Sequence, residues 1–162
     1  MKLASALTLG FLFCCRILIS AQTAPAPPAT APENYSGMYT FLKEGEFVQI
    51  TAEAGGRVTG FVSRYGDGES DRGAFLDQFF KQGKLQGKKL TLTTEVVHGV
   101  WFEFEGMCDR GEGKTPAADA YYVVKGKLTE LRTDAEKKTT SKSREVIFKS
   151  FPQDLEAHPP RD

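Results

Sequence analysis

Short runs of apolar and β-branched residues recur from Gly37 to Phe151, separated by turns that contain glycine. No long stretch of this interval places apolar residues at the spacing of one helix face. Such runs are typical of antiparallel strands joined by tight turns. We therefore predict an all-β fold with strands at 37–43, 46–53, 57–65, 75–85, 89–97, 100–108, 120–132 and 144–151.

The connections between these predicted strands are mostly short, which favours an up-and-down order. About eight antiparallel strands can close into a small barrel whose interior is filled by side chains or holds one small ligand. Closure also removes exposed sheet edges. A small antiparallel up-and-down barrel is the predicted architecture, and a two-sheet β-sandwich is the alternative.

The length of each turn can be tested because a shift of one residue exchanges the two faces of a strand. A three-residue loop at 97–99 pairs Val96 with Val100 and puts Leu92 on the same face as Phe104. A turn shorter by one residue would mix glutamates with the apolar side chains. We therefore predict the three-residue loop, with glycine in its left-handed position.

The same test predicts a three-residue loop at 54–56. Burial of each aliphatic or aromatic side chain on the resulting face contributes roughly 1.5 to 3 kcal/mol, so the register with one clean apolar face should prevail. The predicted core face comprises Val48, Ile50, Ala52, Val58, Gly60, Val62, Leu90, Leu92, Val96, Phe102, Phe104, Tyr122, Val124, Leu128, Val146 and Phe148.

Composition places the chain among ordinary soluble domains and excludes collagen, coiled coil and polytopic membrane protein. It has 162 residues, with 21 basic and 21 acidic side chains, 40% apolar residues and 26% charged residues. This balance supplies no basic surface for nucleic acid and no acidic tail for a basic partner.

The first 21 residues resemble a secretory signal, with Lys2 before a mostly apolar run that is short for a membrane span. We expect cleavage after Ala21 and a secreted or periplasmic product without stable membrane insertion. Arg16 interrupts the apolar run, and an uncleaved signal would instead anchor the protein to the membrane by its N-terminus.

Four segments are expected: a signal peptide at 1–21, a disordered spacer rich in proline and alanine at 22–34, the barrel domain at 35–152 and a flexible tail at 153–162. After cleavage Cys108 is the one remaining cysteine, so no intramolecular disulfide can form. We expect it to behave as a small buried apolar residue.

Carboxylates occur in two patterns that could carry chemistry. Asp67, Glu69 and Asp71 alternate as calcium ligands do, although a solvated acidic loop is the favoured interpretation. Glu103 and Glu105 lie about 7 Å apart on one face of a strand, a spacing compatible with a hydrolase acting on sugars. Nothing in the sequence isolates one of them in an apolar pocket, so a solvated face is favoured here too.

Large aromatic residues on the predicted polar face are more informative than single exposed leucines. They are Phe47, Phe61, Tyr65 and Trp101, with Tyr121 as a possible fifth. They could form a platform for carbohydrate or a partner protein, or a second small core beneath the loops at 66–74 and 109–119. A third alternative reverses the barrel, with a polar lumen and the aliphatic face buried between subunits.

Three stretches, 61–67, 97–106 and 143–152, resemble secreted bacterial domains without an assigned activity. The resemblance covers about residues 57–152 and implies no catalytic residue. The stretch Gly37-Met38-Tyr39 also resembles the first strand of lipocalin-like or calycin barrels, where glycine and an aromatic residue occur. That resemblance implies an apolar ligand in the mouth of a barrel.

We therefore predict an exported, non-catalytic domain that binds a small or amphipathic ligand. The residues expected to frame the pocket are Arg64, Tyr65, Asp77, His98, Trp101 and Glu103. No cofactor, catalytic residue or nucleic-acid partner is indicated, and calcium at 67–71 is the one metal alternative. The identity of the ligand or surface partner and the oligomeric state stay open.

Overall fold

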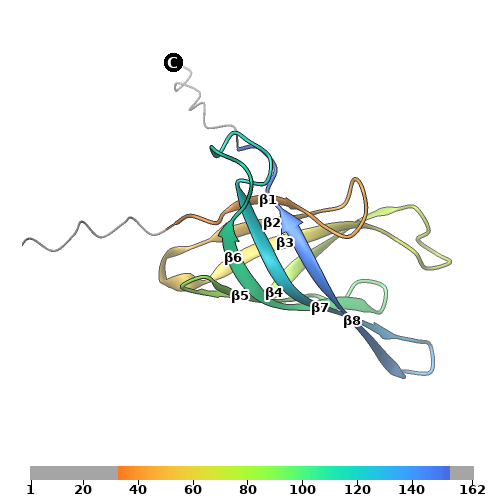
Figure 1. Ribbon diagram of the computed structural model, residues 1–162. Coiled ribbons are helices and arrows are strands. Elements are labelled where there is room, and N and C mark those ends of the chain that lie inside the picture. The colour runs from red at the N-terminus through yellow and green to blue at the C-terminus, as the bar shows by residue number, and fades with distance from the viewer. Residues whose placement is uncertain (1–32, 154–162) are drawn as a thin grey trace, which may run out of the picture. The chain divides into compact units, whose positions relative to one another are not determined.

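The computed structural model describes residues 33–153, so the predicted signal and the ends of the spacer and tail lie outside it. Its strands are β1 (Gly37–Thr40), β2 (Phe47–Ala52), β3 (Val58–Tyr65), β4 (Phe75–Gln86), β5 (Lys89–Thr94), β6 (Val100–Arg110), β7 (Tyr122–Thr133) and β8 (Thr139–Lys149), with a short 3₁₀ turn at Ala54–Gly56. They form one antiparallel sheet in chain order (Figure 1). The all-β up-and-down fold is confirmed, and the two-sheet sandwich does not form. Within these residues, no helix is long and apolar enough to cross a membrane.

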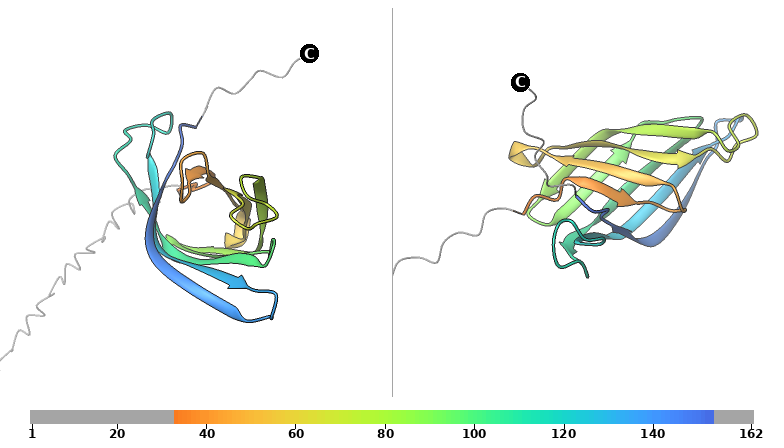
Figure 2. Two further views of the ribbon diagram at one scale, coloured as in Figure 1. Left: turned by 90° about the vertical axis from the view of Figure 1, so that its right-hand side faces the viewer. Right: turned by 90° about the horizontal axis from the view of Figure 1, so that it is seen from above.

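The sheet curls until its first and last strands meet (Figure 2). A backbone bridge joins Tyr39 of β1 to Ser150, just after β8. Beside it, the amide of Phe151 donates to the carbonyl of Met38 at 2.9 Å, and the amide of Lys149 donates to the hydroxyl of Thr40 at 3.0 Å. Because β1 has only four residues and β8 has eleven, this seam covers only the end of β8.

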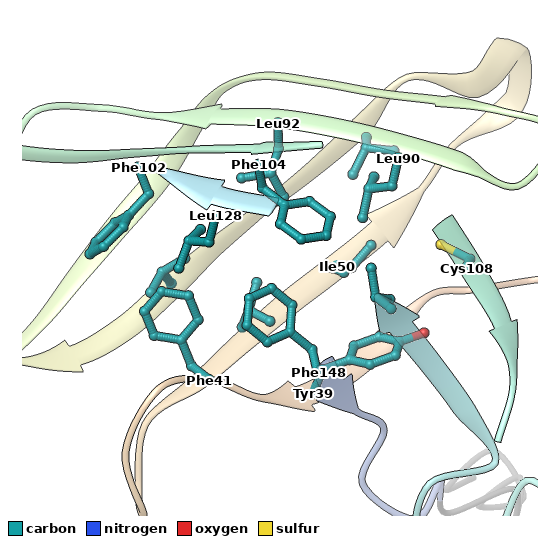
Figure 3. Packing of buried hydrophobic residues seen from close by; sticks show 14 of the residues in the cluster. Tyr39, Phe41, Ile50, Leu90, Leu92, Phe102, Phe104, Cys108, Leu128 and Phe148 are labelled. Carbon is teal, nitrogen blue, oxygen red and sulfur yellow. The ribbon is translucent and has the colours of Figure 1, made fainter. Parts of the chain in front are cut away.

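Alternating side chains point into the curl and form a continuous apolar core (Figure 3). Its residues are Tyr35, Tyr39, Phe41, Val48, Ile50, Val58, Val62, Leu90, Leu92, Val100, Phe102, Phe104, Cys108, Tyr122, Val124, Leu128 and Phe148, with Val146 packed against them. The predicted core face is therefore confirmed at nearly every position, and Cys108 is buried as expected. The reversed barrel is wrong, because the aliphatic face lines the inside.

The turn between β2 and β3 confirms the predicted three-residue loop. Ala52 pairs with Val58, and the pairing continues in that register to Val48 with Val62. Gly55 has a φ of 81°, which a residue without a side chain adopts at no steric cost.

The turn between β5 and β6 differs from the prediction. Val97 pairs with Val100 through two backbone hydrogen bonds of 2.9 and 3.0 Å, which leaves a two-residue turn. His98 and Gly99 have positive φ values of 51° and 75°, as a type I′ turn requires.

The strands beyond this turn nevertheless keep the predicted register, because Leu92 pairs with Phe104. The extra residue lies in the 94–96 segment rather than in the turn, where the pairing changes between Thr93–Glu103 and Val97–Val100. Val96 was expected on the core face, and this prediction is wrong: its side chain is 61% exposed. The bulge preserves the apolar face of both strands while allowing the tighter turn.

Strand β8 begins at Thr139, five residues before its predicted start. Its first residues are polar and exposed, so the sequence lacks the alternation that marks a half-buried strand. Pairing with β7 extends it, from Val123–Lys149 to Thr133–Thr139.

Candidate functional site

One end of the barrel, here called the mouth, is framed by the loops at 41–46, 66–74, 98–99 and 134–138. On the strands that reach it, inward positions change from apolar to charged within two residues. Val62 is followed on the same face by Arg64, and Leu128 by Glu130. The interior therefore ends in a polar layer at the mouth.

This layer borders a cavity of about 410 Å³. One wall is apolar and contains Phe41, Leu42 and Phe102, with the Phe41 and Phe102 rings edge to face at 5.3 Å. The charged part of the lining contributes five basic side chains and three acidic ones. They are Lys43, Arg64, Arg132, Lys142 and Arg144, and Glu46, Asp67 and Glu130.

A buried side-chain network holds Arg64 in place. Gln78 is fully buried, and its amide nitrogen donates to the carbonyls of Val100 at 2.8 Å and Glu95 at 3.1 Å. Its Oε1 accepts a hydrogen bond from Nε of Arg64. The Nη1 of Arg64 donates to the carbonyl of Tyr65 at 3.2 Å. Because its own amide is held by two backbone carbonyls, Gln78 fixes the plane of the guanidinium.

The guanidinium of Arg64 is removed from water but not fully satisfied. Its residue is 4% exposed, and Nη2 has no hydrogen-bond partner in the part of the chain that the structure describes. Burial lowers the pKa of Arg64, yet a guanidinium starts above about 12 and stays charged at neutral pH. Its carbon lies 5.7 Å from the centre of the Phe102 ring.

A second group of charges closes one side of the cavity. Glu130 accepts hydrogen bonds from Arg132 at 2.5 Å and Arg144 at 2.7 Å. Arg132 also binds the carboxylate of Asp67 through both terminal nitrogens, and this bond holds the pKa of Asp67 below its usual range. These contacts tie the β3–β4 loop to β7.

Two of the six predicted pocket residues line this cavity, Arg64 from the inside and Tyr65 at the rim. The structure does not bring the other four to it. Asp77 is hydrogen-bonded to Ser63 on the outer face, and Trp101 lies on the outward-facing side of β6. His98 occupies the β5–β6 turn and Glu103 an outer groove.

The outer groove has a volume of about 1000 Å³ and opens widely to solvent across β4 to β7. Glu103 and Glu105 line it, and both are exposed. Glu105 pairs with Lys89 at 2.6 Å, which lowers the pKa of Glu105. A glycosidase needs one carboxyl group with a raised pKa as its acid, so this pair does not support the hydrolase alternative.

The calcium alternative also lacks geometric support. Asp67 is bound by Arg132, whereas Oδ2 of Asp71 lies 2.8 Å from Nδ1 of His98. Within residues 33–153, no group of three or more acidic, histidine or cysteine side chains is arranged to hold a metal ion.

The predicted outer aromatics are grouped on β2, β3 and β4. Phe47, Phe61 and Tyr65 contact Phe75 and Phe79 in a row, with centroid distances of 5.1 to 6.1 Å. Neighbouring rings are inclined by 46° to 70°, so they do not form the flat platform expected for carbohydrate. Tyr121 lies apart, stacked against Tyr122 and Arg110.

Sequence reasoning missed most of the mouth: Glu46, Gln78, Glu130, Arg132 and Arg144. Their signal was present, because Glu130 and Arg132 have the same parity as Leu128 along β7. A charged residue that continues a core-facing series marks the place where a barrel interior becomes polar.

Comparison with known proteins places the fold among avidin-like calycin β-barrels. Rhizavidin has a TM-score of 0.56 at 9% identity, covering 78% of this chain and 88% of rhizavidin. The rhizavidin–biotin complex gives 0.53 at 9% identity, covering 71% and 98%. Intact afifavidin in its apo form gives 0.53 at 11% identity, covering 78% and 88%. No family model and no curated protein matches the chain.

Proposed function

We propose that this protein binds a small amphipathic organic molecule at the mouth of its barrel. The observation that carries the proposal is the cavity of about 410 Å³, in which phenylalanine rings face charged side chains. Pockets for small molecules combine an apolar wall with a few fixed polar groups in this way.

The depth of the ligand follows from the packing below the cavity. Leu90, Phe104, Val124 and Leu128 are almost fully buried in the core and occupy the interior of the barrel. A ligand would therefore lie between the rim and this apolar floor. Rhizavidin, a barrel of similar fold, forms a complex with biotin, which supports small-molecule binding by this architecture.

The test is calorimetric titration of the full chain with 1-naphthylacetamide, an uncharged aromatic probe. We expect saturable binding at one site. Leu42→Trp places a large ring in the mouth and should abolish binding. Thr91→Trp is the matched control, because it puts the same ring into the outer groove and should leave binding unchanged.

The two variants give opposite outcomes for the two concave surfaces. Binding that survives Leu42→Trp but disappears in Thr91→Trp would assign the ligand to the outer groove and overturn the proposal. Failure of this probe and of its charged analogues to bind would also overturn it.

Export to the periplasm or the medium is part of the same proposal and rests on residues 1–21 of the sequence. N-terminal sequencing of the protein recovered from outside the cytoplasm should begin at Gln22. A start at residue 1 would indicate the N-terminal anchor instead.

A further inference from the structure

We propose that the mouth cavity selects a ligand that carries a carboxylate, with Arg64 as the group that binds it. The inference rests on the proposed function and adds the chemical class of the ligand. It derives from a buried cation whose nearby carboxylates are already engaged.

The first step concerns the carboxylate of Asp67, which lies closest to Arg64 in charge pairing. Its Oδ1 is 3.9 Å from Nη1 of Arg64, beyond hydrogen-bond distance. Both oxygens of Asp67 instead accept from Arg132. Asp67 therefore attracts Arg64 without satisfying its hydrogens.

The other two carboxylates of the lining are also occupied. Glu130 accepts from Arg132 and Arg144. Glu46 is 4% exposed, and its two oxygens accept from the backbone amides of Lys43 at 3.0 Å and Tyr65 at 3.1 Å. Neither oxygen pair is directed to Arg64.

Arg64 is consequently a rigid donor without a protein acceptor on one nitrogen. Nη2 is buried and without a partner among the described residues, as is Nε of Arg144 on the same lining. An unsatisfied buried donor costs roughly 1 to 3 kcal/mol, more when charged. A ligand oxyanion would remove that cost, and the planar guanidinium matches a carboxylate with two parallel hydrogen bonds.

The charge balance and the apolar wall complete the recognition. Five basic and three acidic side chains leave the lining with an excess of two positive charges. The rings of Phe41 and Phe102 lie on the same cavity, and Phe102 contacts the guanidinium face. The structure thus fits a molecule with a carboxylate at Arg64 and an apolar part against these rings.

The experiment compares three probes of similar shape on the full chain by calorimetry: 1-naphthylacetate, 1-naphthylacetamide and 2-(1-naphthyl)ethylamine. We expect the acetate to bind at least about tenfold more tightly than the amide, since a hydrogen bond to a charged group is worth that much. The amine should bind most weakly.

Arg64→Met should bring the affinity for the acetate down to that for the amide. Arg64→Lys should retain part of the preference, because it keeps the charge but not the planar fork. Arg57→Met is the matched control, since Arg57 lies at the opposite end of β3 and pairs with Glu53. It should leave the affinities for all three probes unchanged.

The outcomes separate this inference from the proposed function. Amide and acetate binding with equal affinity to the unmodified protein would overturn the carboxylate inference and leave the proposed function standing. Absence of binding by all three probes would overturn both. If Arg64→Met does not fold, Arg144→Gln and the three-probe comparison on the unmodified protein still decide the matter.

Discussion

The lower part of the barrel and its mouth are built from the same strands but do different work. Below, inward side chains such as Val62 and Leu128 pack into an apolar core. Two residues further along the same strands, Arg64 and Glu130 take those inward positions. The difference indicates that stability is concentrated in the floor, whereas the mouth retains polar groups that a packed core would exclude.

Leu128→Ala should break this comparison most strongly, by opening a cavity in the floor. Leu128 is 1% exposed, and loss of such a side chain costs about 2 to 5 kcal/mol of the free energy of unfolding. Urea denaturation measures the loss. Ile147→Ala on the exposed face of β8 is the control and should change this free energy by less than about 0.5 kcal/mol. Equal losses in the two variants would contradict a floor that carries the stability.

Gln78→Leu tests whether the polar layer is structural as well as functional. The variant leaves Nε of Arg64 and two backbone carbonyls without their partner. We expect a loss of about 1 to 3 kcal/mol in the free energy of unfolding, together with a smaller preference for the acetate over the amide probe. Gln82→Leu, at an exposed position of β4, should change neither quantity. A stable variant with an unchanged preference would show that Gln78 does not position Arg64.

Alkaline pH should weaken the floor in a predictable direction. Burial raises the pKa of the Cys108 thiol to about 12, whereas an unfolded thiol titrates near about 8.5. The unfolded state therefore loses its proton first, so the stabilisation is complete below about pH 8.5 and is lost as the pH rises toward about 12. By about pH 9.5 the loss should reach roughly 1 kcal/mol.

The measurement is urea unfolding at several pH values from 7 to 9.5, for the unmodified protein and Cys108→Ala. The difference in free energy of unfolding between them should shrink as the pH rises. A difference that stays constant would mean that Cys108 ionises equally in both states.

Asp67→Asn should give the smallest effect, at the rim. Its ion pair with Arg132 is partly exposed to solvent, so we expect a loss below about 1 kcal/mol at neutral pH. Because the pKa of Asp67 is lowered in the folded state, its stabilisation is present above about pH 4 and lost as the pH falls. The difference from the unmodified protein in thermal unfolding should thus vanish in acid. A difference that persists at pH 3 would point to a role other than charge.

Much of the floor could be predicted from the sequence because alternation of apolar residues reports directly on which face is buried. The series Leu90 and Leu92 opposite Phe102 and Phe104 fixed the register of β5 and β6 before any coordinates. The location of the extra residue could not be found in this way. A bulge at 94–96 and a longer turn give the same pairing further along the strands, and only Val96 distinguishes them.

The mouth was largely missed because its residues look like exposed strand residues when each is taken alone. Arg132 and Arg144 are polar, as outer positions are, and only their parity places them inside. Gln78 gave no signal at all, since the predicted face of β4 was never assigned through a turn. Trp101 and Glu103 were chosen for their mixed polarity, which does not distinguish the two faces of a strand.

The seam between β1 and β8 has a consequence for how the chain reaches this structure. Every other strand pair joins neighbours in sequence, so seven hairpins can form locally at little entropic cost. Pairing of Tyr39 with Ser150 alone requires the two ends of the domain to find each other. Folding rate should therefore depend on the hairpins, and closure of the seam should come last and open first during local unfolding.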